Sequence, residues 1–367
     1  MSIICDLCGK SDVAPLYRPQ GTKRDAWVYI CNYCGLLFTI TADIPYSKEP
    51  NLSCDADWGN VRFCKCQRFD AIKDDLPTQF MRVLDVGSSR GHFANWYHEQ
   101  NPEAEIVALE PDARINGCGA DIDFRPQYIE NANLSADYFD FVYCCQTLEH
   151  ADSATRVLEE IYKAMKPGGV LFVEVPYTLE IIYYPNNTEE YFIDKHNFHF
   201  VYSTMKEYLQ KTGFEILRSR EDELNISLFA KKTGRITLPS RSLRDDIHAV
   251  QVYARNIQQN RKKIKPAVEK INKLLDTMKV AFWGANTMLD LMVKYGGLDP
   301  KRIGFLADDY MADCIDAIHG IPIRKVDELR VFEPDALVIL ARFSAESMKK
   351  RAQMFGIRNI IKFEDLM

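Results

Sequence analysis

The segment VLDVGSSRGHF, residues 83–93, places the strongest constraint on how this chain can fold. Its first residues form a strand pattern with Asp85 near the end, and Gly87 and Gly91 mark a tight turn before a helical pattern. Ser89 stands where a dinucleotide-binding turn has its middle glycine. The turn alone leaves three interpretations open: an altered dinucleotide site, a site for another ligand, or a tight turn without a ligand.

Strand and helix patterns alternate through residues 79–235, which is typical of an α/β domain with a mostly parallel, Rossmann-like sheet. The predicted strands are Arg82–Val86, Glu105–Glu110, Phe139–Cys145, Gly169–Val175, Glu215–Arg220 and Ile226–Lys231, and the predicted helices are Gly91–Gln100, Ser153–Met165 and Thr204–Thr212. In a sheet of this kind, ligands bind at the carboxyl ends of the strands.

Two further parts follow this domain. Residues 236–278 space apolar side chains helically among many charges, and Pro266 interrupts the pattern, which predicts a connecting helix or helix pair. Residues 279–367 begin with VAFWGA, a strand and turn, and continue with a helix at Thr287–Tyr295 and strands in RIGFLAD and DALVILAR. We therefore expect a second, smaller Rossmann-like domain at the C-terminal end.

Residues 1–78 carry two CxxC pairs, followed by a predicted linking helix. A two-residue gap lets both sulfur atoms of a pair face one zinc ion, and Gly9 and Gly35 follow the second cysteine of each pair, where a knuckle needs a glycine. Four protein ligands leave no open position, so the zinc would be structural. The alternative is two unrelated buried cysteine pairs. The predicted zinc ligands are Cys5, Cys8, Cys31 and Cys34.

Charge and composition narrow the class of protein. The net charge of −6 disfavours a broad nucleic-acid surface, and no apolar run reaches the roughly 18 residues of a membrane span. The first residues carry no secretion signal, so we expect a cytoplasmic protein with reduced thiols. Cys54, Cys64 and Cys66 match no metal-binding spacing and are interpreted as free thiols rather than a second metal site.

The residues after the glycine turn indicate its ligand. Glu110 ends the next strand, and the segments YFDFVYCCQTLEH and LEEIYKAMKPGGVLFVEVP follow as a strand with polar residues at its end, then a helix, a Pro-Gly-Gly turn and a strand. This order, over about residues 80–232, resembles the class I S-adenosylmethionine-dependent methyltransferases. In that family the turn faces the methionine part of the cofactor, so a serine can replace the middle glycine.

The resemblance implies a set of cofactor-binding residues. By this resemblance, the amino-acid end of S-adenosylmethionine is lined by Asp85, Gly87, Ser89 and Gly91, and the ribose hydroxyls donate hydrogen bonds to Glu110. Adenine contacts Tyr128 and Ile129, and the sulfonium lies above Gln146. Tyr128 stands where the family commonly has an aspartate, and ordinary packing is the other interpretation of the pair Tyr128–Ile129.

Candidate catalytic residues lie in two places. Glu149 and His150 lie at the carboxyl end of the fourth strand. They could act together as a catalytic base, or they could only position the cofactor. The aromatic segment after the fifth strand, where the family often has a substrate lid, contributes His196, His199 and Tyr202. Either histidine could be a catalytic base or a structural residue.

The order of zinc knuckles, methyltransferase domain, helical linker and small Rossmann-like domain resembles the deoxysugar C-methyltransferases that act on nucleotide-linked keto-sugars. Two motifs depart from that family. The lid motif, of a His-Glu-His type there, here reads HNFH from His196 to His199, and the C-terminal turn reads Gly284-Ala285-Asn286-Thr287. O-methylation of a sugar therefore stays open beside C-methylation. Gly284, Asn286 and Asp308 suggest that the C-terminal domain contacts a nucleotide or phosphate, or that it only packs on the catalytic domain.

These observations favour a methyltransferase that acts on a small molecule, a nucleotide-linked sugar in glycan or secondary-metabolite biosynthesis. A non-sugar or lipid-linked acceptor is the second interpretation. A non-enzymatic binding module with a vestigial cofactor site is the third, and the preserved residues Asp85, Gly87, Gly91 and Glu110 argue against it. We expect no nucleic-acid partner.

Overall fold

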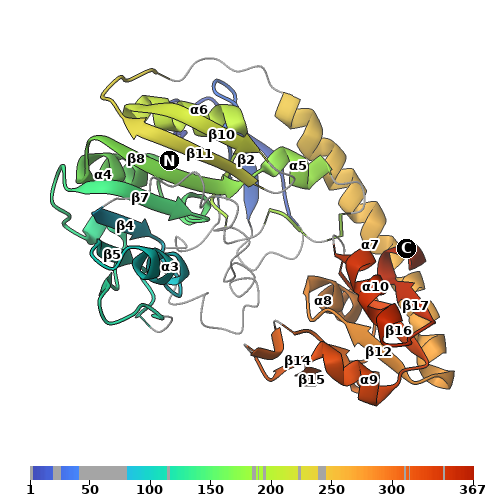
Figure 1. The fold of residues 1–367 in the computed structure, drawn as a ribbon. Coiled ribbons are helices and arrows are strands. Elements are labelled where there is room, and N and C mark those ends of the chain that lie inside the picture. Colours follow the sequence, from blue (N-terminus) through green and yellow to red (C-terminus); the bar gives the residue numbers. More distant parts are fainter. Residues whose placement is uncertain are drawn as a thin grey trace. The chain divides into compact units, whose positions relative to one another are not determined.

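The structure is a computed structural model that describes residues 3–19, 26–40, 81–113, 116–183, 187–188, 190–192, 196–221, 225–238, 245–309, 311–313, 315–341 and 344–367. These residues form two compact units (Figure 1), of which the second comprises residues 187–188, 190 and Tyr253–Met367 and the first comprises the other described residues. Cys54, Cys64, Cys66 and the predicted linking helix lie outside the described residues. The division into four domains, at 1–78, 79–235, 236–278 and 279–367, stays a prediction.

A seven-stranded sheet forms the centre of the first unit, in the order β10-β11-β8-β7-β4-β5-β6. The five strands from β8 to β6 run parallel, and β11 and β10 are antiparallel additions at one edge. This mixed α/β sheet confirms the predicted fold class. The strands are β4 (Arg82–Val86), β5 (Glu105–Leu109), β6 (Asp123–Arg125), β7 (Phe139–Cys145), β8 (Met165–Pro176), β10 (Phe214–Glu221) and β11 (Asn225–Lys232).

Alternate residues of the central strands pack into two separate apolar cores. Leu84 belongs to the core that contains α4 (Ala154–Ala164) and α6 (Tyr202–Thr212), while the neighbouring Val83 belongs to the core that contains α3 (His92–Gln100). Successive side chains of a strand point to opposite faces, so α3 covers one face and α4 and α6 cover the other. Both faces of β4 are therefore buried, and only its carboxyl end can meet a ligand.

The Pro-Gly-Gly segment differs from its prediction as a turn before a strand. Strand β8 already begins at Met165, which pairs with Phe139, and the pairing with β7 resumes from Phe141 and Val170. The extra residues on β8 form an irregularity in which Gly168 has φ +80°. Glycine tolerates this left-handed conformation at no Cβ cost, so the turn lies inside the strand.

A four-stranded antiparallel sheet carries the paired cysteines, in the order β1-β2-β3-β9. Strands β1 (Val13–Tyr17), β2 (Trp27–Cys31) and β3 (Leu37–Ile40) come from the N-terminal region, but β9 (Phe198–His199) comes from the aromatic segment after β8. Leu37 pairs with His199 and Phe38 with Phe198. The N-terminal sheet therefore holds part of the segment predicted as a lid.

The second unit contains a six-stranded sheet in the order β14-β15-β13-β12-β16-β17. Its core also includes residues of α7 (Asp245–Thr277) and α8 (Thr287–Lys294). The strands are β12 (Val280–Trp283), β13 (Leu306–Ala307), β14 (Ala317–Ile318), β15 (Ile321–Arg324), β16 (Ala336–Ile339) and β17 (Ile360–Lys362), and the further helices are α9 (Leu329–Phe332) and α10 (Ala345–Met354). Helix α5 (Thr178–Tyr183) belongs to the first unit.

Helix α7 is one continuous helix of 33 residues and not a helix pair. Ile264, Val268 and Ile271 repeat at helical spacing and lie in the core of the second unit. Pro266 and Lys262 are exposed, so water can bind the Lys262 carbonyl that proline leaves without a helical partner. Among the helices of the described residues, none has the length and apolar character that crossing a membrane requires.

Asp6 attaches the first cysteine knuckle to two helices that cover the seven-stranded sheet. Its carboxylate accepts hydrogen bonds from the Ser153 hydroxyl at 2.5 Å, the Thr155 amide at 3.0 Å and the Tyr208 hydroxyl at 3.0 Å. Its carbonyl accepts hydrogen bonds from the Thr155 hydroxyl at 2.9 Å and the Lys211 ammonium at 3.4 Å. One residue thus contacts the start of α4 and the body of α6.

We predict that Asp6→Ala lowers the free energy of unfolding by about 2–3 kcal/mol, because hydrogen bonds to a charged group are lost and the Tyr208 hydroxyl is left buried. Asp12→Ala is the matched control, since the Asp12 carboxylate accepts a hydrogen bond from the Asn32 side chain at 2.8 Å, near the protein surface. Denaturant unfolding of zinc-replete protein measures both. Equal losses in the two variants would contradict a special role of Asp6.

Candidate active site and zinc centre

The four predicted zinc ligands lie in one group. The Sγ atoms of Cys5 and Cys34 are 3.6 Å apart, those of Cys8 and Cys31 are 3.5 Å apart, and all four lie within 4.8 Å of one another. Zinc–sulfur bonds of about 2.3 Å in a tetrahedron separate the sulfur atoms by roughly 3.8 Å. The group therefore fits one tetrahedral metal ion.

The knuckle geometry supports the same assignment. Gly9 and Gly35 have φ +71° and +78°, and their amides donate to the carbonyls of Cys5 and Cys31 at 2.8 and 3.0 Å. Hydrogen bonds from neighbouring thiols, that of Cys34 first, hold the pKa of Cys31 far below its usual value. These four residues would hold a structural zinc, whose chemistry is to stabilise the thiolates and close the loops.

The glycine turn after β4 has three residues with left-handed backbones. Gly87, Ser89 and Gly91 have φ +73°, +48° and +71°. A Cβ on Gly87 would lie 2.2 Å from the Thr147 hydroxyl, and one on Gly91 would lie 2.4 Å from the Cys118 sulfur. Both glycines are therefore required, because a side chain there would clash with its neighbours and because φ is positive. Ser89 also has a positive φ, but it carries its side chain in this left-handed conformation.

Glu110 lies against this turn from the end of the neighbouring strand β5. Its carboxylate accepts hydrogen bonds from the Ser89 amide at 3.0 Å and the Asp112 amide at 3.1 Å. Burial raises the pKa of Glu110, and these two amides oppose that shift. The carboxylate is thus held at the position where an acidic residue binds ribose hydroxyls in a Rossmann-like sheet.

Asp85 is a buried carboxylate near the end of the central strand. It is 1% exposed, and neither of its oxygens has a hydrogen-bond partner among the described residues. Burial, and secondarily the charge of Glu110, raises the pKa of Asp85 well above its usual range. A buried carboxylate of this kind fits a ligand with a positive charge, and S-adenosylmethionine carries both an ammonium and a sulfonium.

The other three predicted cofactor residues differ in their environments. Tyr128 is partly exposed, and burial together with the charge of Asp152 raises its pKa. Ile129 is 4% exposed and belongs to the core beneath the sheet. Gln146 follows β7 with φ +52°, and its side-chain amide donates to Asn225 at 3.0 Å. Ile129 therefore packs in the apolar core, while the side chains of Tyr128 and Gln146 are accessible at the carboxyl end of the sheet.

Glu149, His150 and His196 form a group beside this edge. The His150 Nε2 and a Glu149 carboxylate oxygen are 3.8 Å apart, and the rings of His150 and His196 are 5.0 Å apart. One ligand atom from each of the three residues lies within 4.8 Å of the others. The Asn197 amide donates to the Glu149 carbonyl at 2.7 Å, which brings the aromatic segment to this group.

His199 and Tyr202 lie apart from that group. His199 is 1% exposed, its Nε2 is 2.6 Å from the Thr39 hydroxyl, and burial lowers its pKa to about 3. Tyr202 is the first residue of α6 and packs against the core of the first unit. The structure thus joins one of the two lid histidines to Glu149 and His150 and the other to the N-terminal sheet.

Tyr191 is a site residue that sequence reasoning did not select. Its ring centre is 6.1 Å from that of His196 and 5.7 Å from that of His199, and its hydroxyl is 2.8 Å from the Thr178 hydroxyl. Burial raises the pKa of Tyr191. Its only sequence signal is the crowding of aromatic residues, because the contact with Thr178 depends on the fold.

Comparisons with known proteins match two regions of the chain. A model described as "Methyltransferase domain" matches residues 63–219, and one described as "C-methyltransferase C-terminal domain" matches residues 240–361. The ubiquinone biosynthesis O-methyltransferase of Xylella fastidiosa (strain 9a5c) is 33% identical over 115 residues, which cover 29% of this chain and 46% of that protein. The protein of the same name from Xanthomonas oryzae pv. oryzae (strain PXO99A) is 30% identical over 113 residues, 29% of this chain and 47% of its own. The chain spans about half the length of these relatives.

Among solved structures, the putative S-adenosylmethionine-dependent methyltransferase from Listeria monocytogenes is similar over 45% of this chain and 97% of its own. Its sequence identity is 17% and its TM-score is 0.39.

We predict that the purified chain holds zinc at the four-cysteine group and that Cys31→Ser lowers its zinc content by at least one half. A serine hydroxyl is a poor zinc ligand compared with a thiolate. Cys118→Ser is the control, because Cys118 lies outside the group. Elemental analysis of protein exchanged into metal-free buffer measures the ratio, and equal zinc content in both variants would exclude this site.

We predict that Asp85→Asn stabilises the chain without cofactor and weakens its binding of S-adenosylhomocysteine at least tenfold, about 1.4 kcal/mol. The folded state raises the pKa of Asp85, so this carboxyl costs increasing stability as pH rises above its unfolded value of about 3.9. The advantage of the variant should therefore grow as the pH rises above the unfolded-state pKa, and level off once the pH passes the raised folded-state pKa.

Unfolding at several pH values and calorimetry with S-adenosylhomocysteine measure the two effects of Asp85→Asn. The exposed Asp121→Asn should change neither quantity. An Asp85→Asn variant with unchanged affinity would remove Asp85 from the cofactor site.

Proposed function

We propose that this chain, an S-adenosylmethionine-dependent methyltransferase with a C-methyltransferase C-terminal domain, methylates a carbon or oxygen atom of a nucleotide-linked sugar. The observation that carries the proposal is the group of Glu149, His150 and His196 beside the end of β7. It supplies proton-accepting side chains next to the predicted cofactor residues. The cofactor, when bound, supplies an electrophilic methyl group on a sulfonium.

The three residues have distinct parts in this proposal. His150 accepts the proton that leaves the acceptor carbon or hydroxyl. The buried Glu149 carboxylate, 3.8 Å away, stabilises the positive charge that the ring then carries. His196 faces His150 from the aromatic segment and orients the acceptor, and Asn197 holds that segment through its bond to the Glu149 carbonyl.

The description of the C-terminal match favours carbon as the methyl acceptor. A carbon beside a keto group is a weak acid, so its methylation depends more on a base than O-methylation does. The reduced cysteines of the zinc centre suit a cytoplasmic location.

A second candidate acceptor is a non-sugar or lipid-linked hydroxyl compound. It is favoured by the similarity to the two ubiquinone biosynthesis O-methyltransferases, although that similarity covers 29% of this chain. A panel of keto-sugar and hydroxyl-sugar nucleotides, with a catechol as the non-sugar acceptor, distinguishes the candidates when a deuterated methyl donor is used. Mass spectrometry detects the transfer, and methylation of the catechol alone would reject the sugar proposal.

We predict that His150→Asn lowers kcat by about 10²- to 10⁴-fold and changes the affinity for S-adenosylhomocysteine less than twofold, because a base is lost and cofactor contacts are kept. His248→Asn is the control, since His248 is exposed on α7. With a keto-sugar, the unmutated chain should also exchange the acidic carbon-bound hydrogen for deuterium from solvent without a methyl donor. Normal exchange in His150→Asn would assign the base elsewhere.

A further inference from the structure

Glu149, His150 and His196 combine two imidazoles and one carboxylate in a single group of the first unit. One ligand atom from each lies within 4.8 Å of the others, and the His150 Nε2 is 3.8 Å from a Glu149 carboxylate oxygen. Histidine nitrogen and carboxylate oxygen are the ligands of one common class of zinc site. In the proposed function these side chains move a proton and orient the acceptor, but the same atoms can bind a metal ion.

The distances allow one ion to contact all three side chains. Bonds of about 2.1 Å to a tetrahedral ion separate its ligand atoms by roughly 3.4 Å. The 3.8 Å between the His150 and Glu149 atoms is slightly longer, so small side-chain rotations bring both to bonding distance. The rings of His150 and His196 are 5.0 Å apart and inclined by 58°, so they are not stacked and a nitrogen of each can point to a common centre.

Asn197 fixes the backbone that carries the three side chains. Its amide donates to the Glu149 carbonyl at 2.7 Å, and its side chain donates to the Ala151 carbonyl at 3.0 Å. His150 lies between these two acceptors in the chain, and His196 directly precedes Asn197. The two segments are therefore held together before an ion binds, which lowers the conformational entropy that binding costs.

Burial and charge at this group favour a cation. Glu149 is 1% exposed, whereas the side chain of His150 is 29% exposed. A buried carboxylate gains more from a nearby positive charge than an exposed one does, because little water screens the attraction. The partly exposed imidazole of His150 gives an ion access from solvent.

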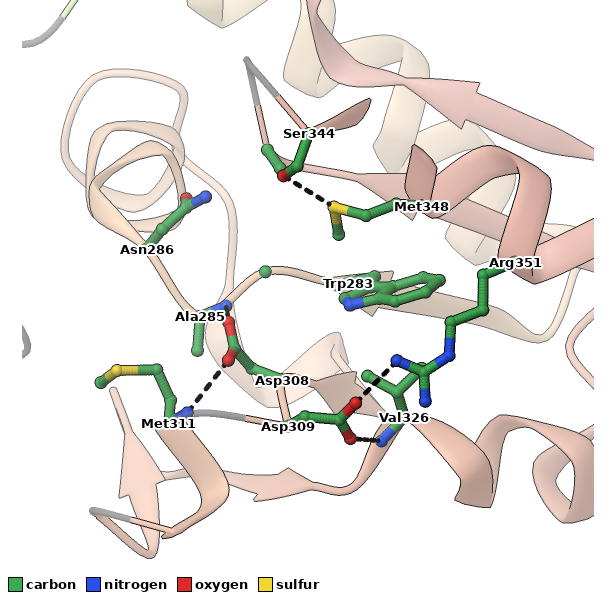
Figure 2. A pocket seen from close by; sticks show the side chains of 12 residues that line it. Trp283, Ala285, Asn286, Asp308, Asp309, Met311, Val326, Ser344, Met348 and Arg351 are labelled. Carbon is green, nitrogen blue, oxygen red and sulfur yellow. Dashed lines mark hydrogen bonds and ion pairs between the residues drawn. The ribbon is translucent and has the colours of Figure 1, made fainter. Parts of the chain in front are cut away.

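Carboxylates in the second unit have a different environment. Figure 2 shows Asp308 and Asp309 at a pocket of that unit. Asp308 accepts hydrogen bonds from two backbone amides, while Asp309 accepts one from the Val326 amide and lies 2.8 Å from the Arg351 guanidinium. A metal ion would have to displace these donors, and the arginine would repel it. Asp309 therefore provides an acidic control for metal binding.

The ligand types at Glu149, His150 and His196 select the kind of ion. Imidazole suits zinc, copper, iron and nickel ions, whereas magnesium and calcium prefer sites built from oxygen ligands. Three protein ligands also leave a fourth position open, in contrast to the closed four-cysteine group. The group thus fits a divalent transition-metal ion that exchanges more readily than the structural zinc.

We infer that Glu149, His150 and His196 form a second metal-binding site, which takes a divalent transition-metal ion such as zinc and thereby inhibits methyl transfer. The ion occupies the imidazole nitrogen with which His150 would accept the proton of the acceptor. Binding of the ion is independent of the proposed function, whereas the inhibition rests on it.

The first test measures zinc binding by the full chain. Exchange into metal-free buffer is expected to leave the zinc of the four-cysteine group, and calorimetry with added zinc should then detect one further ion per chain. His150→Asn and His196→Asn should each weaken this second binding at least tenfold. His248→Asn, on the exposed side of α7, and Asp309→Asn should change it less than twofold. Magnesium at the same concentration should not bind.

Cobalt(II) distinguishes the two metal groups by absorption. Cobalt bound by nitrogen and oxygen ligands gives visible d–d bands, and cobalt bound by cysteine adds a strong thiolate charge-transfer band. Titration of the zinc-loaded chain should give the d–d bands alone. His196→Asn should remove them, and His248→Asn should leave them unchanged.

The second test measures inhibition, with the acceptor that the nucleotide-sugar panel identifies. Zinc should inhibit the unmutated chain over the concentration range in which it fills the second site. His196→Asn keeps His150 and Glu149, so the methyl transfer that remains in this variant should require at least tenfold more zinc for the same inhibition.

Three results would overturn the inference. One is the absence of a second bound ion with both zinc and cobalt at millimolar concentration. Another is a second ion whose affinity is the same in the unmutated chain, His150→Asn and His196→Asn. The third is a faster methyl transfer when the site is filled. Zinc binding as expected without methylation of any sugar would reject the proposed function alone, and sugar methylation without a second ion would reject this inference alone.

Discussion

The pairing of β3 with β9 is the interaction on which the candidate active site depends. It joins a strand next to the zinc knuckles to a segment about 160 residues later, and the Thr39 amide extends it by donating to the Asn197 carbonyl at 2.8 Å. Asn197 in turn donates to the carbonyl of Glu149. The N-terminal sheet therefore positions the aromatic segment against the end of β7. In this position His196 lies beside His150, and His199 is buried against Thr39 of the N-terminal sheet.

Through this dependence the predicted zinc centre would influence the candidate active site without lying near it. Four sulfur atoms organise the knuckles, Asp6 attaches them to α4 and α6, and the sheet that grows from them holds β9. Loss of the metal would loosen the loops first and the position of His196 through them. The predicted zinc would in this way help to position His196, which is proposed to orient the acceptor.

Buried carboxylates lower the folding stability of the chain at the positions where a ligand is predicted to bind. Asp85 and Glu110 are held in surroundings that raise their pKa values, and Glu149 is 1% exposed beside a histidine. A core built for stability alone would exclude them, because burying a charged group costs free energy. Each lies at the carboxyl end of a strand, where a positively charged or hydroxyl-bearing ligand can offset that cost.

Local pattern was sufficient for most of the secondary structure. The periodicity of apolar residues predicted β4 and β7 to the residue, α3 and α4 to within one residue at each end, and the α/β class. The differences have physical causes. Strand β8 includes the Pro-Gly-Gly segment because β8 pairs with β7 on both sides of it. Helix α7 is continuous because Pro266 lies on its exposed side.

The sequence by itself determined the four-cysteine group, the glycine turn and the acid that follows it, because in each the chemistry lies in short spacings along the chain. Only the tertiary structure decided that His150 and His196 lie side by side and that His199 is a buried partner of Thr39. Those relations join residues far apart in the chain. Strand pairing and core packing bring them together, and neither leaves a periodic signal in the local sequence.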